Sequence, residues 1–179
     1  MYRIMIVDDE PSILSALSRM LEDVEEWDLE TYDCAADGLK RAQTATFDVF
    51  VSDYRMPDMN GVEFLTEAKK LQPESMRIIL SGFTDLEALL GAINTAEIFR
   101  FICKPWDDSD LIETLKHALT YRDTLVENRM LADQLRNQRQ ELDKRKMVVE
   151  KLVEQHPTSI AVDWAEDGTM IIDESFLDN

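Results

Sequence analysis

Two apolar runs of the chain end in carboxylates, and these acids are the residues best suited to do chemistry. The run Phe47–Ser52 is followed directly by Asp53, and the run Arg3–Val7 is followed by Asp8 and Asp9. Short runs rich in Val, Ile and Phe, separated by helical patterns, predict buried parallel strands. Ligands of such sheets gather at the carboxyl ends of the strands. Because three acids there would repel one another, we expect a cation among them, and carboxylate oxygens suit Mg²⁺.

Two more strand ends add a hydroxyl and an ammonium group. The run Arg77–Leu80 leads into Ser81, and the run Phe99–Cys103 leads into Lys104. Mg²⁺ and Lys104 would neutralise the oxygens of a phosphoryl group, Ser81 would donate a hydrogen bond to it, and Asp53 would be the in-line nucleophile. Each feature alone is common. Together, at the ends of four strands, these residue types indicate a phosphoryl site.

The elements that must position these side chains follow from the spacing of the apolar residues. Helices are predicted from Pro11 to Leu21, from Asp37 to Ala45, from Gly61 to Leu71, from Thr84 to Ala96 and from near Ser109 onwards, with a further strand at Trp27–Tyr32. Ser109 is the expected N-cap of the last helix, and Asp58 is expected to cap the helix at Gly61. Five strands alternating with five helices predict an α/β fold, a doubly wound parallel sheet in the flavodoxin-like order 2-1-3-4-5.

Composition narrows the classes of function. The chain has 179 residues, 45% of them hydrophobic, which allows one ordinary domain plus an appendage. Its 37 Asp and Glu residues outnumber its 19 Lys and Arg residues, and a net charge of -18 would repel a phosphate backbone. We therefore expect no direct contact with nucleic acid. No signal-peptide pattern or long apolar stretch occurs, which predicts a cytoplasmic protein without membrane insertion.

Several reactive residue types have plainer interpretations. Cys34 and Cys103 do not form a metal-ligand spacing and are interpreted as small buried hydrophobic residues. His117 and His156 have no neighbouring Cys or acid cluster, so we expect them on exposed helix surface. Trp106 is expected to pack at the start of the last helix.

Four segments resemble the receiver domain of two-component response regulators. They are Val7-Asp8-Asp9-Glu10, Asp53-Tyr54-Arg55-Met56-Pro57-Asp58-Met59-Asn60-Gly61, Ser81-Gly82 and Phe101-Ile102-Cys103-Lys104-Pro105. The resemblance covers about residues 1–120. It implies that Asp53 accepts a phosphoryl group from a histidine kinase or a phosphotransfer protein. It also implies that Asp9, Asp53 and the main-chain carbonyl of Arg55 bind Mg²⁺ directly, and that Asp8 binds it through water.

The same resemblance implies roles for the other residues of the site. Ser81 and Lys104 would contact the phosphoryl group, and Ser81 and Phe101 would form the switch, in which the ring of Phe101 rotates on activation. The Lys104–Pro105 bond resembles one that is often cis. Such a protein is a phosphoacceptor that catalyses only its own phosphorylation and dephosphorylation.

Beyond residue 120 the last helix is expected to continue. Residues 109–155 contain no Gly or Pro, which allows a helix of about 70 Å at 1.5 Å per residue. In a heptad register the a positions are Tyr121, Asn128, Leu135, Leu142 and Val149, and the d positions are Thr124, Leu131, Gln138, Arg145 and Leu152. This pattern predicts a parallel coiled-coil homodimer in which Asn128 specifies the register. The alternative is a solvated linker helix.

The last residues read as a hairpin and an acidic tail. Residues 159–164 alternate, Gly168 follows in a turn, and residues 169–172 return as a second strand. An isolated hairpin is marginally stable, so we expect it to cover a second subunit or an absent domain. The predicted domains are a receiver at 1–120, a helical coiled-coil extension at 121–156, and a hairpin with tail at 157–179.

Phosphorylation of Asp53 is thus expected to switch the dimer or partner-binding state of the extension, towards a downstream protein partner. Three alternatives stay open. A haloacid-dehalogenase-like phosphatase would need a second Asp two residues after its nucleophile, where Arg55 stands. A constitutive coiled-coil adaptor would leave the acid site unused. A receiver fragment of a larger regulator would carry an enzymatic output such as a cyclic-dinucleotide phosphodiesterase, because Arg100–Asp107 resembles receivers attached to such enzymes.

Overall fold

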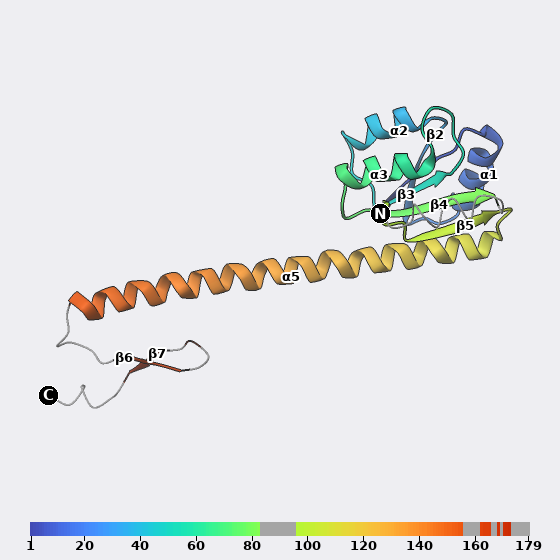
Figure 1. Ribbon diagram of the computed structural model, residues 1–179. Coiled ribbons are helices and arrows are strands. Elements are labelled where there is room, and N and C mark those ends of the chain that lie inside the picture. The colour runs from blue at the N-terminus through green and yellow to red at the C-terminus, as the bar shows by residue number, and fades with distance from the viewer. Residues whose placement is uncertain (83–95, 156–161, 166–167, 169, 173–179) are drawn as a thin grey trace. The chain divides into compact units, whose positions relative to one another are not determined.

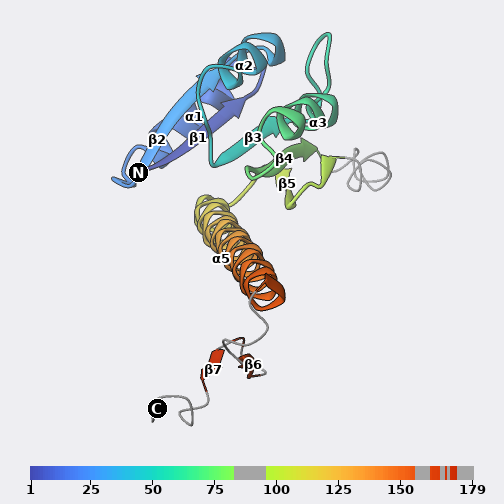
Figure 2. The same cartoon turned by 90° about the vertical axis from the view of Figure 1, so that its left-hand side faces the viewer.

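The N-terminal part of the chain forms a five-stranded parallel sheet. The computed structural model describes residues 1–82, 96–155, 162–165, 168 and 170–172. The strands lie in the order β2-β1-β3-β4-β5 and are β1 (Tyr2–Val7), β2 (Trp27–Tyr32), β3 (Val49–Asp53), β4 (Met76–Gly82) and β5 (Arg100–Lys104) (Figure 1, Figure 2). Every neighbouring pair is parallel. The predicted fold class and strand order are therefore confirmed.

Both faces of the sheet are covered, which explains why the three inner strands β1, β3 and β4 are mostly buried. Successive strand residues point to opposite faces, so Ile4 and Ile6 belong to one hydrophobic cluster and Met5 and Val7 to another. The first cluster packs against α1 (Pro11–Leu21) and α5 (Asp108–Gln155). The second packs against α2 (Ala35–Ala42) and α3 (Gly61–Leu71), which lie together on one side of the sheet in Figure 1.

Several predicted boundaries shift by a few residues. The helix predicted at Asp37–Ala45 runs from Ala35 to Ala42. The amide of Gln72 donates to the carbonyls of Ala42 and Ala45 and so satisfies acceptors at and beyond the end of this helix. The helix predicted at Thr84–Ala96 lies outside the described residues, apart from Ala96.

Both predicted N-caps are wrong, and in each case a neighbouring residue caps the helix. Asn60, not Asp58, caps α3: its side chain accepts from the Glu63 N–H, and Glu63 accepts from the Asn60 N–H in return. Asp58 instead has a φ of 65° in the loop. At α5 the Asp107 carboxylate accepts from the backbone N–H groups of Ser109 and Asp110, so Ser109 lies inside the first turn.

The plainer interpretations of single residues are mostly confirmed. Trp106 packs against the first hydrophobic cluster, and His117 is exposed beside Glu113. His156 lies outside the described residues. Cys34 and Cys103 are free thiols, but they are half-buried rather than buried, because Cys34 precedes α2 and Cys103 lies on the edge strand β5.

The contacts divide the chain into two units, Met1–Val126 and Glu127–Asn179. Within the first unit one face of α5 is buried as far as Leu119, and beyond it α5 is held by a ring contact between Tyr121 and Phe99 and by polar contacts. The hydroxyl of Tyr2 donates to Asp123 over 2.6 Å, and Arg122 pairs with Asp48 at 2.9 Å.

The second unit contains the rest of α5 and the hairpin β6 (Val162–Trp164) and β7 (Met170–Ile172). The tail at 173–179 lies outside the described residues, and the division at 120 and 156 stays a prediction. Within the described part of the chain, no helix is both long and apolar enough to cross a membrane.

Candidate functional site

The predicted site residues converge at the carboxyl end of the sheet. An open pocket there is lined by Asp8, Asp9, Glu10, Pro11, Asp53, Arg55, Gly82 and Lys104. Asp53 and Lys104 are the last residues of β3 and β5, and Asp8 follows β1 directly. The neighbouring strands β1, β3, β4 and β5 thus bring together side chains that are up to 96 positions apart in the sequence.

The ammonium group of Lys104 lies between two of the carboxylates. Its Nζ is 2.7 Å from Asp8 Oδ2 and 2.5 Å from Asp53 Oδ1. Asp8 is completely buried, and its other oxygen accepts from the backbone N–H of Glu10 at 2.9 Å. Asp9 is exposed at the rim of the same pocket. With three carboxylates and one ammonium group, the centre of the site carries an excess of two negative charges.

Burial and pairing act against each other on the ionisation of this site. Burial raises the pKa of Asp8, and the hydrogen bonds from Lys104 and the Glu10 N–H offset this only in part. Burial lowers the pKa of Lys104, but the hydrogen bonds to Asp53 and Asp8 outweigh it, so its pKa lies above the usual value. Lys104 therefore stays a cation at neutral pH.

Asp53 is held by its own loop and by the start of α3. Its Oδ2 accepts from the backbone N–H of Arg55 at 2.5 Å, and its carbonyl accepts from the buried hydroxyl of Ser52. A Cβ atom on Gly61 would lie 2.1 Å from the Asp53 carbonyl oxygen, so any other residue at position 61 would displace this backbone. Sequence reasoning missed Ser52 and missed this role of Gly61.

The hydroxyl of Ser81 is buried without a hydrogen-bond partner among the described residues. A buried hydroxyl that lacks a partner costs free energy, so it indicates a group that binds there. In the β4–β5 register Ser81 pairs with Cys103 and Ile79 pairs with Phe101. Phe101 is half-buried against the second hydrophobic cluster, and the Lys104–Pro105 bond is cis as predicted.

The donor atoms suit a hard divalent cation, although they do not enclose one. Among the described residues, no three His, Cys, Asp or Glu side chains converge as a metal site, because Lys104 separates Asp8 from Asp53. Nonetheless the oxygen-rich pocket, its two excess negative charges and the exposed carboxylate of Asp9 fit Mg²⁺, which keeps several of its own waters when bound.

Comparisons with known proteins agree with this geometry. A family model for the response regulator receiver domain matches residues 4–116. The hydrogenase transcriptional regulatory protein HoxA of Cupriavidus necator is 37% identical over 116 residues, which make up 65% of this chain and 24% of HoxA. The chain thus spans about a quarter of that relative's length.

Two solved structures show the same fold over most of their length. The signal receiver domain of an HD domain-containing protein from Pseudomonas fluorescens Pf-5 is 31% identical, with a TM-score of 0.67, covering 70% of this chain and 92% of that one. A CheY-like receiver domain protein from Methanospirillum hungatei JF-1 is 32% identical, with a TM-score of 0.65, covering 69% of this chain and 98% of that one.

Proposed function

Because the chain belongs to the response regulator receiver domain family, we propose that Asp53 accepts a phosphoryl group from a histidine kinase or a phosphotransfer protein. The observation that carries this proposal is the contact of 2.5 Å between Asp53 and the Lys104 ammonium group in an open pocket. A carboxylate beside a fixed cation can attack an incoming phosphorus atom while the cation neutralises the phosphoryl oxygens.

The other residues complete the proposed chemistry. The partnerless hydroxyl of Ser81 would donate to the phosphoryl group. Phe101 lies two residues before Cys103, which pairs with Ser81 on the neighbouring strand. The ring of Phe101 would rotate in response. Ser81 lies on β4 and Phe101 on β5, the last two strands at one edge of the sheet. A change at Ser81 therefore has a short route to the surface near β5.

Mg²⁺ would bind at Asp9, Asp53 and the main-chain carbonyl of Arg55, with Asp8 contacting it through water. The burial of Asp8 and its pairing with Lys104 favour this indirect role, whereas Asp9 is accessible to a hydrated cation. When bound, the metal would supply positive charge for the equatorial phosphoryl oxygens.

A small phosphodonor with Mg²⁺ tests this function, with intact mass as the measurement. The receiver proposal expects one acid-labile phosphoryl group per chain. Turnover without retained phosphate would favour the phosphatase alternative. Failure to react would favour the constitutive adaptor and contradict the proposal.

Magnesium is expected to raise the melting temperature of the protein. A dication relieves the repulsion among the carboxylates, and binding to the folded state alone stabilises it, by about 2.7 kcal/mol at a hundredfold excess over Kd. Asp9→Ala should remove most of this rise, as seen by differential scanning calorimetry. Glu22→Ala, at the exposed end of α1, is the control and should respond like the wild type. An unchanged response of Asp9→Ala would rule out Asp9 as a ligand.

The output is proposed to lie in the extension, which would dimerise through α5. Leu131, Leu135 and Leu152 are exposed at a or d positions, as expected for a seam that a second copy would cover. An enzymatic output in a longer chain remains the second candidate, since the similar receiver from Pseudomonas fluorescens belongs to an HD domain-containing protein.

A further inference from the structure

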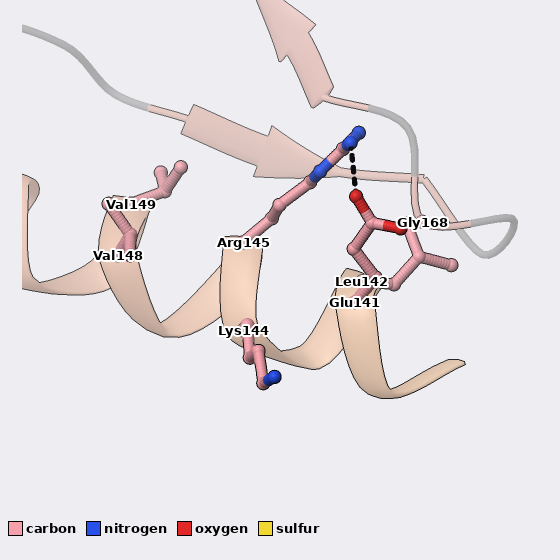
Figure 3. A pocket seen from close by; sticks show the side chains of 7 residues that line it. All are labelled: Glu141, Leu142, Lys144, Arg145, Val148, Val149 and Gly168. Carbon is pink, nitrogen blue, oxygen red and sulfur yellow. Dashed lines mark hydrogen bonds and ion pairs between the residues drawn. The ribbon is translucent and has the colours of Figure 1, made fainter. Parts of the chain in front are cut away.

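The C-terminal hairpin lies against a stretch of α5 that a second copy would also need. In the unit Glu127–Asn179 a pocket is lined by Gly168 of the hairpin turn and by Glu141, Leu142, Lys144, Arg145, Val148 and Val149 of α5 (Figure 3). Leu142, Arg145 and Val149 are successive a, d and a positions of the heptad register. Figure 3 shows Arg145 and Val149 on the side of α5 that faces the hairpin, with Lys144 pointing away.

Exposure along α5 supports this contact. Leu135 and Leu142 are the same residue type at the same heptad position, yet Leu135 is 66% exposed and Leu142 is 42% exposed. Val149, the next a position, is half-buried. Lys146 is half-buried too, and its Cε lies 4.0 Å from where a Cβ of Gly168 would stand. Beside the hairpin end Val149 and Lys146 are therefore half-buried, whereas Leu142 stays exposed.

The hairpin itself needs an apolar surface. Its register pairs Val162 with Ile172 and Trp164 with Met170, so both outer pairs are apolar. A two-stranded hairpin is marginally stable in water by itself. The uncovered seam of α5 is an apolar surface within the same unit. The sequence alone did not indicate that the hairpin could lie against it.

We propose that the hairpin covers the α5 seam of its own chain at Leu142–Val149 and competes there with the α5 of a second copy. This inference rests on the dimer seam of the proposed function. The two occupants exclude each other, because a coiled coil needs Leu142 and Val149 as knobs in the partner helix. Dimers then form only from chains whose hairpin has lifted. If the hairpin is closed in about two thirds of chains, the apparent Kd of the dimer rises about ninefold, since both copies must be open.

Gly168→Val in the full chain tests this competition. Gly168 has a φ of 83°, and its N–H donates to the Ala165 carbonyl at 2.9 Å, which closes the turn. A β-branched residue cannot adopt this backbone without strain, so the hairpin should open while α5 keeps its sequence. The dimer Kd, measured by sedimentation equilibrium, is expected to fall about ninefold. Gly168→Asn is the matched control, because Asn tolerates a positive φ, and should keep the Kd of the wild type.

An unchanged dimer Kd for Gly168→Val would overturn the proposed competition. A higher Kd would also overturn it, because it would mean that the hairpin contributes to the dimer. If neither chain dimerises, the seam of the proposed function fails and the competition fails with it. The phosphoacceptor role of Asp53, read separately by intact mass, would then still stand.

The contact within one chain has its own measurement. A nitroxide label on Ala165→Cys, with Cys34 and Cys103 changed to Ser, should broaden the amide signals of residues 141–149. Mixtures of isotope-labelled chains without nitroxide and unlabelled chains with nitroxide report only contacts between chains. We expect broadening when one chain carries both the isotope label and the nitroxide, but not in the mixture. Broadening in the mixture alone, or in neither sample, would overturn the proposal.

Discussion

Asp53→Asn is expected to abolish phosphorylation of the protein by a small phosphodonor. An amide oxygen is a poor nucleophile and a weaker ligand for Mg²⁺, so both parts of the proposed chemistry are lost at once. The fold should survive, because Asn is close in size to Asp and keeps an oxygen that can accept from the Arg55 N–H. Intact mass after reaction should show no added phosphoryl group, against one per chain in the wild type.

Asp58→Asn provides the matched control for this experiment. Asp58 is an exposed acid in the same loop, five residues beyond Asp53, and its φ of 65° suits Asn. The same chemical change there should leave phosphorylation at the wild-type level. Full labelling of Asp53→Asn would move the acceptor to another residue, and loss of labelling in both variants would point to the loop rather than to the carboxylate.

The convergence of the site could be predicted because it follows from short-range patterns. Apolar runs that end in Asp53, Ser81 and Lys104 define strand ends, and parallel strands in a doubly wound sheet place their carboxyl ends along one edge. Their convergence can be predicted without knowledge of side-chain packing. The strand order β2-β1-β3-β4-β5 was predictable for the same reason.

Contacts that depend on competition between neighbouring groups were not predictable. Asp and Asn both cap helices well, but Asn60 directly precedes α3, whereas Asp58 lies in the loop with a positive φ. Likewise, three acids suggested a cation between them, yet the ammonium group of Lys104 lies between two of them. The 2.1 Å approach to Gly61 depends on backbone positions that no composition or spacing reveals.

The end of the receiver stays a prediction, and contacts of α5 with residues distant in sequence bear on it. Helical propensity runs unbroken through α5, so the sequence predicted a boundary at residue 120 from the extent of the resemblance alone. In the structure Tyr2 and Asp48 hold Asp123 and Arg122, and the first unit extends to Val126. A truncated receiver should therefore end after Val126, because a chain that ends at residue 120 would lose both contacts.

Removal of two seam leucines is expected to convert the dimer to a monomer. Leu131→Ala with Leu135→Ala removes one d and one a side chain, both upstream of the stretch beside the hairpin. Each change should cost roughly 2 kcal/mol of apolar burial across two chains, so the Kd should rise about a thousandfold for the pair. Light scattering of the full chain at tens of micromolar would report this as a fall to the mass of a single chain.

The control for the seam uses apolar residues outside it. Met130 and Met147 are as exposed as the seam leucines but occupy c and f positions, so Met130→Ala with Met147→Ala removes apolar surface without touching the seam. This variant should remain a dimer, as should the wild type, while the chain ending at Val126 should be a monomer that still accepts phosphate at Asp53. If the wild type and Gly168→Val are both monomers at tens of micromolar, with or without phosphate, α5 is a linker. A solvated helix needs no partner when ion pairs such as Arg145–Glu141 support it.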